Sequence, residues 1–127
     1  MNQTLVERIT SQKFLDSLLP PEKSDQFFEA LYGEASEGTY DIRLVFSTVE
    51  PDRIVFAFHL VQRPGKCLVC SLTYGLPTVF SRHPLINIKG MINKIKEEGL
   101  ALKGWDLGDT REISSSLHLV PLYLYLG

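Results

Sequence analysis

The sequence predicts an α+β domain in which an antiparallel sheet of about five strands packs with one face against helices. Apolar residues in the first third of the chain have helical spacing, and from Tyr40 onward the spacing changes to two. The turn Glu50-Pro51-Asp52 is short, whereas a parallel connection needs about a dozen residues or more. We therefore expect a three-strand meander, a helix and two further strands, with the N-terminal helices packed on one face.

The length and composition fit a single domain that spans residues 1–127. Hydrophobic residues make up 44% of the chain and charged residues 22%, which is typical of globular proteins and excludes a disordered or fibrous class. No apolar run approaches the roughly 18 residues of a membrane helix. The N-terminal segment MNQTLVERIT lacks the basic and apolar regions of a secretory signal. We expect a cytoplasmic protein with no membrane association.

Two helical segments are predicted before the first strand. Thr4 and Glu7 form a capping box, and a break is expected near Thr10-Ser11. Pro20-Pro21 ends the first segment and begins the second, PEKSDQFFEALYG, which Gly33 can close. The apolar residues expected to pack on the sheet are Leu5, Ile9, Leu15, Leu18, Leu19, Phe27, Phe28 and Leu31.

Three consecutive strands are expected next. Residues 40–47 and 54–61 alternate between two faces, and both faces of 54–61 are largely apolar, which predicts a central strand. Pro64-Gly65 indicates a turn, and KCLVCSLTY, residues 66–74, is predicted to be the third strand of the meander. The segment TVFSRHP that follows, residues 78–84, is predicted to be a loop or a short extended segment.

A helix and two strands complete the predicted fold. Residues 85–98 carry an apolar stripe at helical spacing that Gly99 closes. Strands are predicted at 100–107, with Trp105 as a large anchor, and at 117–126. Because Pro121 cannot donate a ladder hydrogen bond, the last strand is expected at an edge of the sheet or bulged at this residue.

The two cysteines, Cys67 and Cys70, lie three residues apart in the predicted third strand. Extended residues at this spacing point to opposite faces with Cα atoms about 10 Å apart, so we expect no disulfide between them. Leu68-Val69 is a poor turn for a zinc knuckle. The residues that follow do not favour the helix of a thioredoxin-like site.

A metal site of cysteine and histidine depends on the register of the second and third strands. One register places His59 opposite Cys70, with Cys67 and His83 as further candidate ligands. The alternative register brings the apolar faces of both strands to one side, and this one is expected because the buried face decides register. Cys70 is then a small core residue and Cys67 lies on the other face, and we predict no metal or other cofactor.

Residues 63–96 contain six basic residues and no acidic residue. Such a segment can form a surface for an anion, a nucleic acid or an acidic protein. The candidate contact residues are Arg63, Lys66, Arg82 and Lys89, beside Tyr74 and Phe80, which are expected to be exposed. The simpler interpretation is a solvated face whose balancing acids come from elsewhere in the fold, so nucleic acid is a less favoured partner.

The segment from Pro64 to Pro84 resembles a family of small bacterial proteins of similar length with no assigned function, and the likeness extends over most of the chain. It implies no activity, cofactor or site residue. Separately, the predicted order of three strands, a helix and two strands is similar to that of type III secretion chaperones, which are small dimeric clamps for effector segments. This chain departs from them in being only mildly acidic and in lacking a clear C-terminal helix.

Enzyme motifs are not found in the sequence, which has no G-x-S-x-G elbow, P-loop, H-E-x-x-H motif or dinucleotide fingerprint. A cysteine paired with a histidine, or Ser71 or Ser81 paired with His83, is a formal catalytic alternative. A protein-binding or chaperone-like module without catalytic function is the favoured prediction.

The predicted C-terminal strand, HLVPLYLYL, is the candidate interface. It has almost no polar residue to face water, and no segment after Gly127 is expected to cover its second face. Tyr123 and Tyr125 alternate with Leu122 and Leu124, so we expect one set in the core and the other in a contact with another chain. The simplest such contact is a homodimer through Tyr123 and Tyr125.

Overall fold

The computed structural model describes residues 3–34, 36, 38–69 and 73–127. Its helices are α1 (Gln3–Thr10), α2 (Gln12–Leu18), α3 (Glu22–Tyr32), α4 (Leu76–Arg82) and α5 (Ile88–Glu97), with the short 3₁₀ helix η2 at Thr73–Gly75. Its strands are β1 (Tyr40–Val49), β2 (Arg53–Gln62), β3 (Leu102–Leu107), β4 (Arg111–Ser114) and β5 (Leu117–Leu126). Every strand pair among these is antiparallel, which confirms the α+β class and the five-stranded antiparallel sheet.

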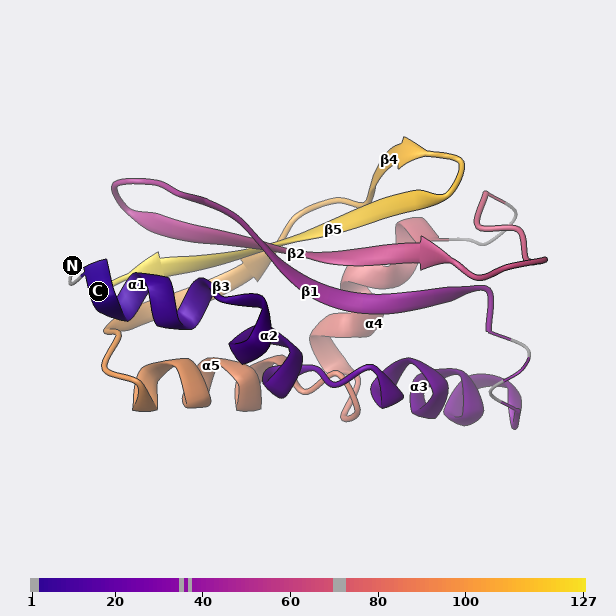
Figure 1. Ribbon diagram of the computed structural model, residues 1–127, viewed down its shortest axis with the longest axis horizontal. Coiled ribbons are helices and arrows are strands. Elements are labelled where there is room, and N and C mark those ends of the chain that lie inside the picture. The colour runs from indigo at the N-terminus through magenta and orange to yellow at the C-terminus, as the bar shows by residue number, and fades with distance from the viewer. Residues whose placement is uncertain (1–2, 35, 37, 70–72) are drawn as a thin grey trace.

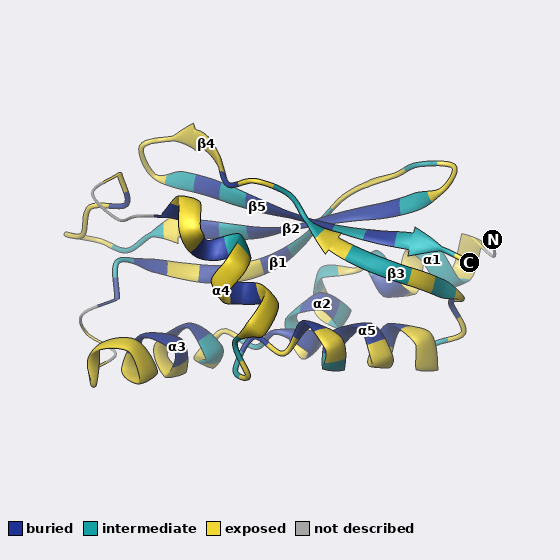
Figure 2. Ribbon diagram, turned by 180° about the vertical axis from the view of Figure 1, so that it is seen from behind, coloured by how far each residue is buried: buried dark blue, intermediate teal, exposed yellow. Residues whose placement is uncertain are grey.

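The strand order of the sheet is β1-β2-β5-β3, and β4 pairs with β5. The helices lie on one side of the sheet, as Figure 1 shows. The opposite side carries no helix of the described residues, and the reverse view in Figure 2 agrees. None of the helices in the described ranges is long and apolar enough to cross a membrane.

Two of the N-terminal helix boundaries lie at residue types that are typical of helix ends. Ser11 separates α1 from α2, and its hydroxyl accepts a hydrogen bond from the Phe14 amide. Gly33 ends α3 with a φ of 83°, in the left-handed region that favours glycine. Buried residues of these helices, such as Ile9, Leu15 and Phe27, belong to the same core as the inner face of the sheet.

The core lies between the helices and the inner face of the sheet. Phe58 of β2 packs edge-to-face on Phe80 of α4, with ring centroids 5.2 Å apart, and Phe80 packs in the same way on Phe27 of α3 at 5.8 Å. All three side chains are fully buried. These contacts join β2, α4 and α3, which lie apart in sequence, into one core.

The predicted third strand at residues 66–74 is wrong for the part of it that the structure describes. Residues 68 and 69 form a bend and a turn, and η2 begins at Thr73, while residues 70–72 lie outside the described residues. The physical reason is that β2 is already paired on both sides, with β1 and with β5. No position beside β2 remains for a third strand of a meander.

The segment after η2 forms two helices, where a loop and one longer helix were predicted. Residues expected to be a loop form α4, and Phe80, expected on the surface, is buried and anchors this helix to the core. α5 begins at Ile88 because Asn87 caps it, accepting a hydrogen bond from the Gly90 amide at 3.2 Å. Asn87 has a φ of 49°, which asparagine tolerates better than most residues.

Pro121 lies in a central strand without a register shift toward β2, so its expected place at an edge or bulge is wrong. The Gly108 amide donates to the Pro121 carbonyl at 2.9 Å, so this carbonyl points away from β2, and pairing with β3 ends at Leu107. The N–H and C=O of a strand residue point to the same side. The missing N–H of Pro121 therefore falls in the gap between β3 and β4, where no ladder bond is lost.

The free edge of β1 is covered by side chains of the N-terminal helices. The Ser24 hydroxyl accepts from the Ile42 amide at 2.8 Å and donates to the Ile42 carbonyl at 3.3 Å. The Gln12 side chain donates to the Leu44 carbonyl at 2.8 Å. An uncovered edge strand is a template for pairing with another chain, and these bonds close that route at the centre of β1.

Replacement of Ser24 by alanine is expected to lower the free energy of unfolding by about 1–3 kcal/mol, because it leaves the buried Ile42 amide and carbonyl without this partner. Urea unfolding followed by circular dichroism measures the change. Ser17→Ala is the matched control, since the Ser17 hydroxyl is exposed and bonds only within its own helix. Equal stability of the Ser24 and Ser17 variants would contradict a role for Ser24 in closing the edge.

Candidate interaction surface on the open face of the sheet

The open face is the side of the sheet turned away from the helices, and strand alternation fixes its residues. β1 contributes Asp41, Arg43, Val45 and Thr48, β2 contributes Arg53, Val55, Ala57, His59 and Val61, and β5 contributes Leu117, Leu119, Pro121, Tyr123 and Tyr125, while β3 and β4 add Asp106 and Arg111 at the border. Most of these side chains are apolar or aromatic. The face is therefore the part of the described surface where apolar side chains of three neighbouring strands meet without a covering helix.

The centre of the open face is apolar and well packed. Val55 is 8% exposed and Ala57 is 5% exposed although no described helix lies over them. In the β2–β5 register Val55 is opposite Tyr123 and Ala57 is opposite Pro121, so neighbouring side chains shield them. Tyr123 and Tyr125 are themselves half-buried on this face, whereas the alternating Leu122 and Leu124 lie in the core.

Arg53 holds the ring of Tyr123 in place. Its guanidinium carbon lies 4.4 Å from the centroid of the Tyr123 ring, a cation–π contact. The same guanidinium donates to Glu50, and this hydrogen bond raises the pKa of Arg53 above its usual value. The positive charge beside the two tyrosines is therefore balanced by an acid of the same hairpin.

Arg43 and Arg63, at the border of the open face, are paired within the chain as well. The pairs are Arg43 with Asp16 at 3.3 Å, and Arg63 with Asp25 at 2.7 Å and with Asp41 at 3.0 Å. The hydrogen bond from Arg43 lowers the pKa of the Asp16 carboxyl. Exposed ion pairs contribute little to stability, but they cancel charge. The open face thus has an apolar centre with three neutralised arginines at its border, whereas Arg111 of β4, the register partner of Leu119, is exposed and forms no ion pair with any described residue.

His59 is the titratable group at the centre of the open face. It lies between Arg43 of β1 and Leu119 of β5 in the register of the sheet. Burial lowers the pKa of its imidazole below 6.5, and the charge of Arg43 lowers it further. Neutral His59 is therefore favoured in the folded protein near pH 7.

Acidification below about pH 6.5 is expected to reduce stability through His59, because the unfolded chain binds the proton more readily than the folded one. The contribution is fully present above pH 6.5 and is lost as the pH falls through the lower pKa of folded His59. Urea unfolding between about pH 7.5 and 5 measures it. His59→Asn should flatten this part of the curve, and parallel curves for the two proteins would show that His59 does not cause the slope.

The four residues of the predicted anion surface lie on three separate segments, with Arg63 and Lys66 in one turn, where the Lys66 amide donates to the Arg63 carbonyl at 3.1 Å. Arg63 follows β2 and is neutralised by two aspartates, Lys66 lies in the connection after it, Arg82 is in the last turn of α4, and Lys89 is in the first turn of α5. Tyr74 is exposed as expected, and its hydroxyl donates to Glu112 at 2.8 Å, which raises the pKa of Tyr74. The pairing of Arg63 removes one charge from the proposed basic surface.

The candidate metal ligands are separated by the sheet. His59 lies on the open face, whereas His83 follows α4 on the helical side, where its ring packs 4.8 Å from the ring of Phe27. Among the described residues no group of three or more histidine, cysteine or acidic side chains could hold a metal ion. Because β2 pairs with β1 and β5, the register that placed His59 opposite Cys70 does not occur; Cys70 itself lies outside the described residues.

Cys67 takes part in a disulfide bond, which corrects the prediction that it does not. That prediction assumed an extended strand, whereas the chain bends and turns at Leu68 and Val69. The Leu68 amide donates to the Gln62 side chain at 3.0 Å, which helps to hold this bend against the end of β2. Of the candidate catalytic hydroxyls, Ser71 lies outside the described residues, and Ser81 donates to the carbonyl of Thr78 in its own helix at 2.8 Å.

Val55, Ala57 and Arg53 are open-face residues that the sequence interpretation did not assign to a contact. The sequence contained the signal for this surface, because both faces of β2 are apolar. One face of this central strand packs on the core, and the other apolar face then needs a contact of its own. Only the pairing of β2 with β5 shows that these residues and the two tyrosines form one surface.

No protein-family model matches the sequence, and neither a curated protein nor a solved structure is significantly similar to it.

Proposed function

We propose that this chain is a protein-binding module without catalytic function and that it acts as a homodimer joined through the open face of the sheet. The observation that carries the proposal is the one-sided arrangement of the helices, which leaves an apolar and aromatic sheet face without a covering helix. Contiguous apolar surface of this kind on a folded domain usually marks an interface. Tyrosine is enriched in such contacts because it tolerates both water and burial.

A second copy of the chain is the occupant that the charges favour. Arg43, Arg53 and Arg63 are neutralised by Asp16, Glu50, Asp25 and Asp41, and among the described residues Arg111 is the bordering arginine without an ion pair, so two copies can approach without strong repulsion. A nucleic acid or a strongly acidic protein would be favoured by unpaired arginines instead. In a twofold dimer the same patch serves both partners, and sheets packed face to face bury alternate residues of their strands.

The size of the open face predicts a dimer of moderate affinity. β2 and β5 stay in register over nine residue pairs. This length is about 30 Å, and three strands are about 14 Å wide, which gives a patch of roughly 400 Å². Standard stable interfaces bury about 800 Å² on each partner, so we expect a dissociation constant in the micromolar range.

Sedimentation equilibrium of the wild-type chain tests the proposal. Between about 1 and 500 μM the apparent mass should rise from that of the 14.4 kDa monomer to twice that value. Because the contact is apolar, a change from about 0.1 M to 0.5 M salt should leave the affinity unchanged or raise it. A monomer at every concentration would overturn the proposal, and so would an affinity that falls steeply with salt, since that behaviour belongs to a charged contact.

A further inference from the structure

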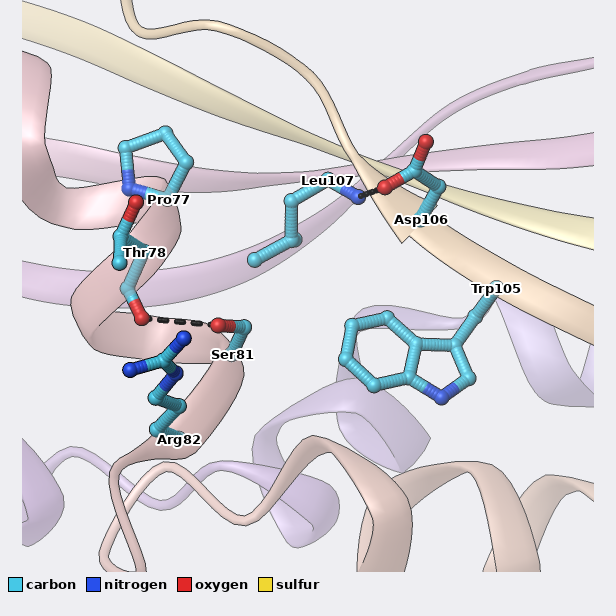
Figure 3. Close-up of a pocket in the computed structure, with 7 residues that line it drawn as sticks. All are labelled: Pro77, Thr78, Ser81, Arg82, Trp105, Asp106 and Leu107. Carbon is cyan, nitrogen blue, oxygen red and sulfur yellow. Dashed lines mark hydrogen bonds between the residues drawn. The ribbon is translucent and has the colours of Figure 1, made fainter.

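A pocket of about 370 Å³ lies between α4 and the end of β3, away from the open face. Figure 3 shows its two walls, with Thr78, Ser81 and Arg82 on α4 and the indole of Trp105 and the side chain of Leu107 on β3. The volume is within the range of small binding sites, and the pocket combines an apolar wall with polar groups. It can therefore take a side chain or another small group.

The wall formed by β3 is also a strand edge. β3 pairs with β5 on one side and with no other described strand. The Gly108 amide donates to the Pro121 carbonyl of β5. Because the backbone groups of successive strand residues alternate in direction, the N–H and C=O of Trp105 point away from β5, toward the free edge of the sheet. The β1 edge is closed by Ser24 and Gln12, whereas among the described residues the side-chain hydrogen bond at this part of β3 is the one from the Leu107 amide to Asp106. Trp105 thus offers a donor and an acceptor beside the pocket.

The charge of the other wall is available to a ligand. Arg82 is exposed and forms no ion pair with any residue that the structure describes. The Asp106 carboxylate accepts the Leu107 amide at 2.8 Å and thus caps the strand edge next to the pocket. An arginine beside an apolar wall binds a carboxylate through charge-assisted hydrogen bonds.

We propose that this groove binds an extended segment of a partner protein, which adds to the edge of β3 as an antiparallel strand and places an acidic side chain against Arg82. Strand addition of this kind takes its affinity from backbone hydrogen bonds and its specificity from pockets for alternate side chains. Trp105 and Leu107 face the helical side of the sheet, since their partners Leu124 and Leu122 are core residues. The partner residue opposite Trp105 projects to the same side and enters the pocket beside Arg82. The open face stays free, so this site is independent of the proposed dimer.

Selection from a displayed library of random peptides on the immobilised full chain tests the proposal. The selected peptides should share one acidic position flanked by β-branched residues in alternation. The chain contains a single tryptophan, so binding of each peptide can be followed by the fluorescence of Trp105 itself. Changing the acidic residue to its amide should weaken binding at least about tenfold, and proline at a neighbouring paired position should abolish it.

Two variants locate the contact. Arg82→Gln should weaken the binding of an acidic peptide at least about tenfold and leave the binding of its amide form unchanged. Lys89→Gln removes the same charge from α5 and should leave the affinity of both peptides unchanged. Failure to select any peptide, selection of peptides without an acidic position, or binding that leaves Trp105 fluorescence unchanged would each overturn the proposal. The same titrations on the Tyr123→Asp/Tyr125→Asp variant should give unchanged affinities, which separates this site from the dimer contact.

Discussion

Aspartate at both Tyr123 and Tyr125 is expected to weaken self-association by at least about a hundredfold while leaving the sheet intact. Tyr123 lies opposite Val55 and Tyr125 lies opposite Arg53 at the end of the β2–β5 register, and an interface hot spot contributes about 2 kcal/mol or more. Two buried like charges facing their copies across a twofold axis add repulsion. Because Leu122 and Leu124 supply the core side of β5, far-UV circular dichroism should change little.

The matched control for this double variant is Leu31→Asp/Val79→Asp. These residues are 48% and 37% exposed and lie on α3 and α4, so the same two charges are added on the helical side. The control should sediment as the wild type does. Equal self-association of the tyrosine variant and the wild type would mean that the open face is not the contact, and unfolding of the tyrosine variant would show that the strand needs both rings for its own stability.

Phe58→Ala is expected to lower the free energy of unfolding by about 3–5 kcal/mol, the largest effect of a single substitution considered for this fold. Phe58 is fully buried, and its ring is the one on β2 that contacts Phe80 of α4. The cavity would lie between the sheet and two helices that are themselves anchored through Phe80 and Phe27, so the surroundings have little freedom to close it.

Phe46→Ala is the control for that measurement. Phe46 is on the same face of the sheet, but it is half-buried, and among the described residues its ring contacts one other ring, that of Phe56, at 6.1 Å. Guanidinium unfolding should therefore show a clearly smaller loss for Phe46→Ala. Similar losses for the two variants would contradict the position of Phe58 at the junction of β2, α4 and α3.

The helices and strands with a clear periodicity of apolar residues were predictable from the sequence. The last strand, residues 117–126, has the bounds that its run of leucine and tyrosine predicts, and Gly33 ends the helix that it was expected to end. The break near Ser11 was also readable, because a serine that caps the next helix interrupts the apolar stripe. Local chemistry decides each of these features, so one sequence suffices to predict them.

The prediction failed where the outcome depends on competition between distant segments. Residues 66–74 and 117–126 both have strand character, and only one of them can pair with the second side of β2. The C-terminal segment pairs over nine positions and buries Val120, Leu122 and Leu124, so it takes this place. The earlier segment turns at Leu68 and Val69 instead, and the chain continues into η2 and α4. A local sequence pattern does not show which of the two segments pairs with β2.

The candidate surface was predictable only in part for the same reason. Tyr123 and Tyr125 could be proposed from their alternation with leucine, but the residues beside them are set by strand order. The placement of β5 between β2 and β3 brings Val55 and Arg53 to the tyrosines, and it leaves the edge of β3 open beside Arg82. The basic segment looked more continuous in sequence than it is in the fold, where Arg63 is held by two aspartates.

The most direct test of the open face as the self-association surface is the amide and methyl NMR spectrum of the wild-type chain on dilution. Signals should shift with concentration at Val55, Ala57 and His59 of β2 and at Leu119, Tyr123 and Tyr125 of β5, while those of α3 and α5 stay fixed. Spectra that do not change with dilution into the low micromolar range and show a monomer, or shifts confined to the helical side, would contradict the account.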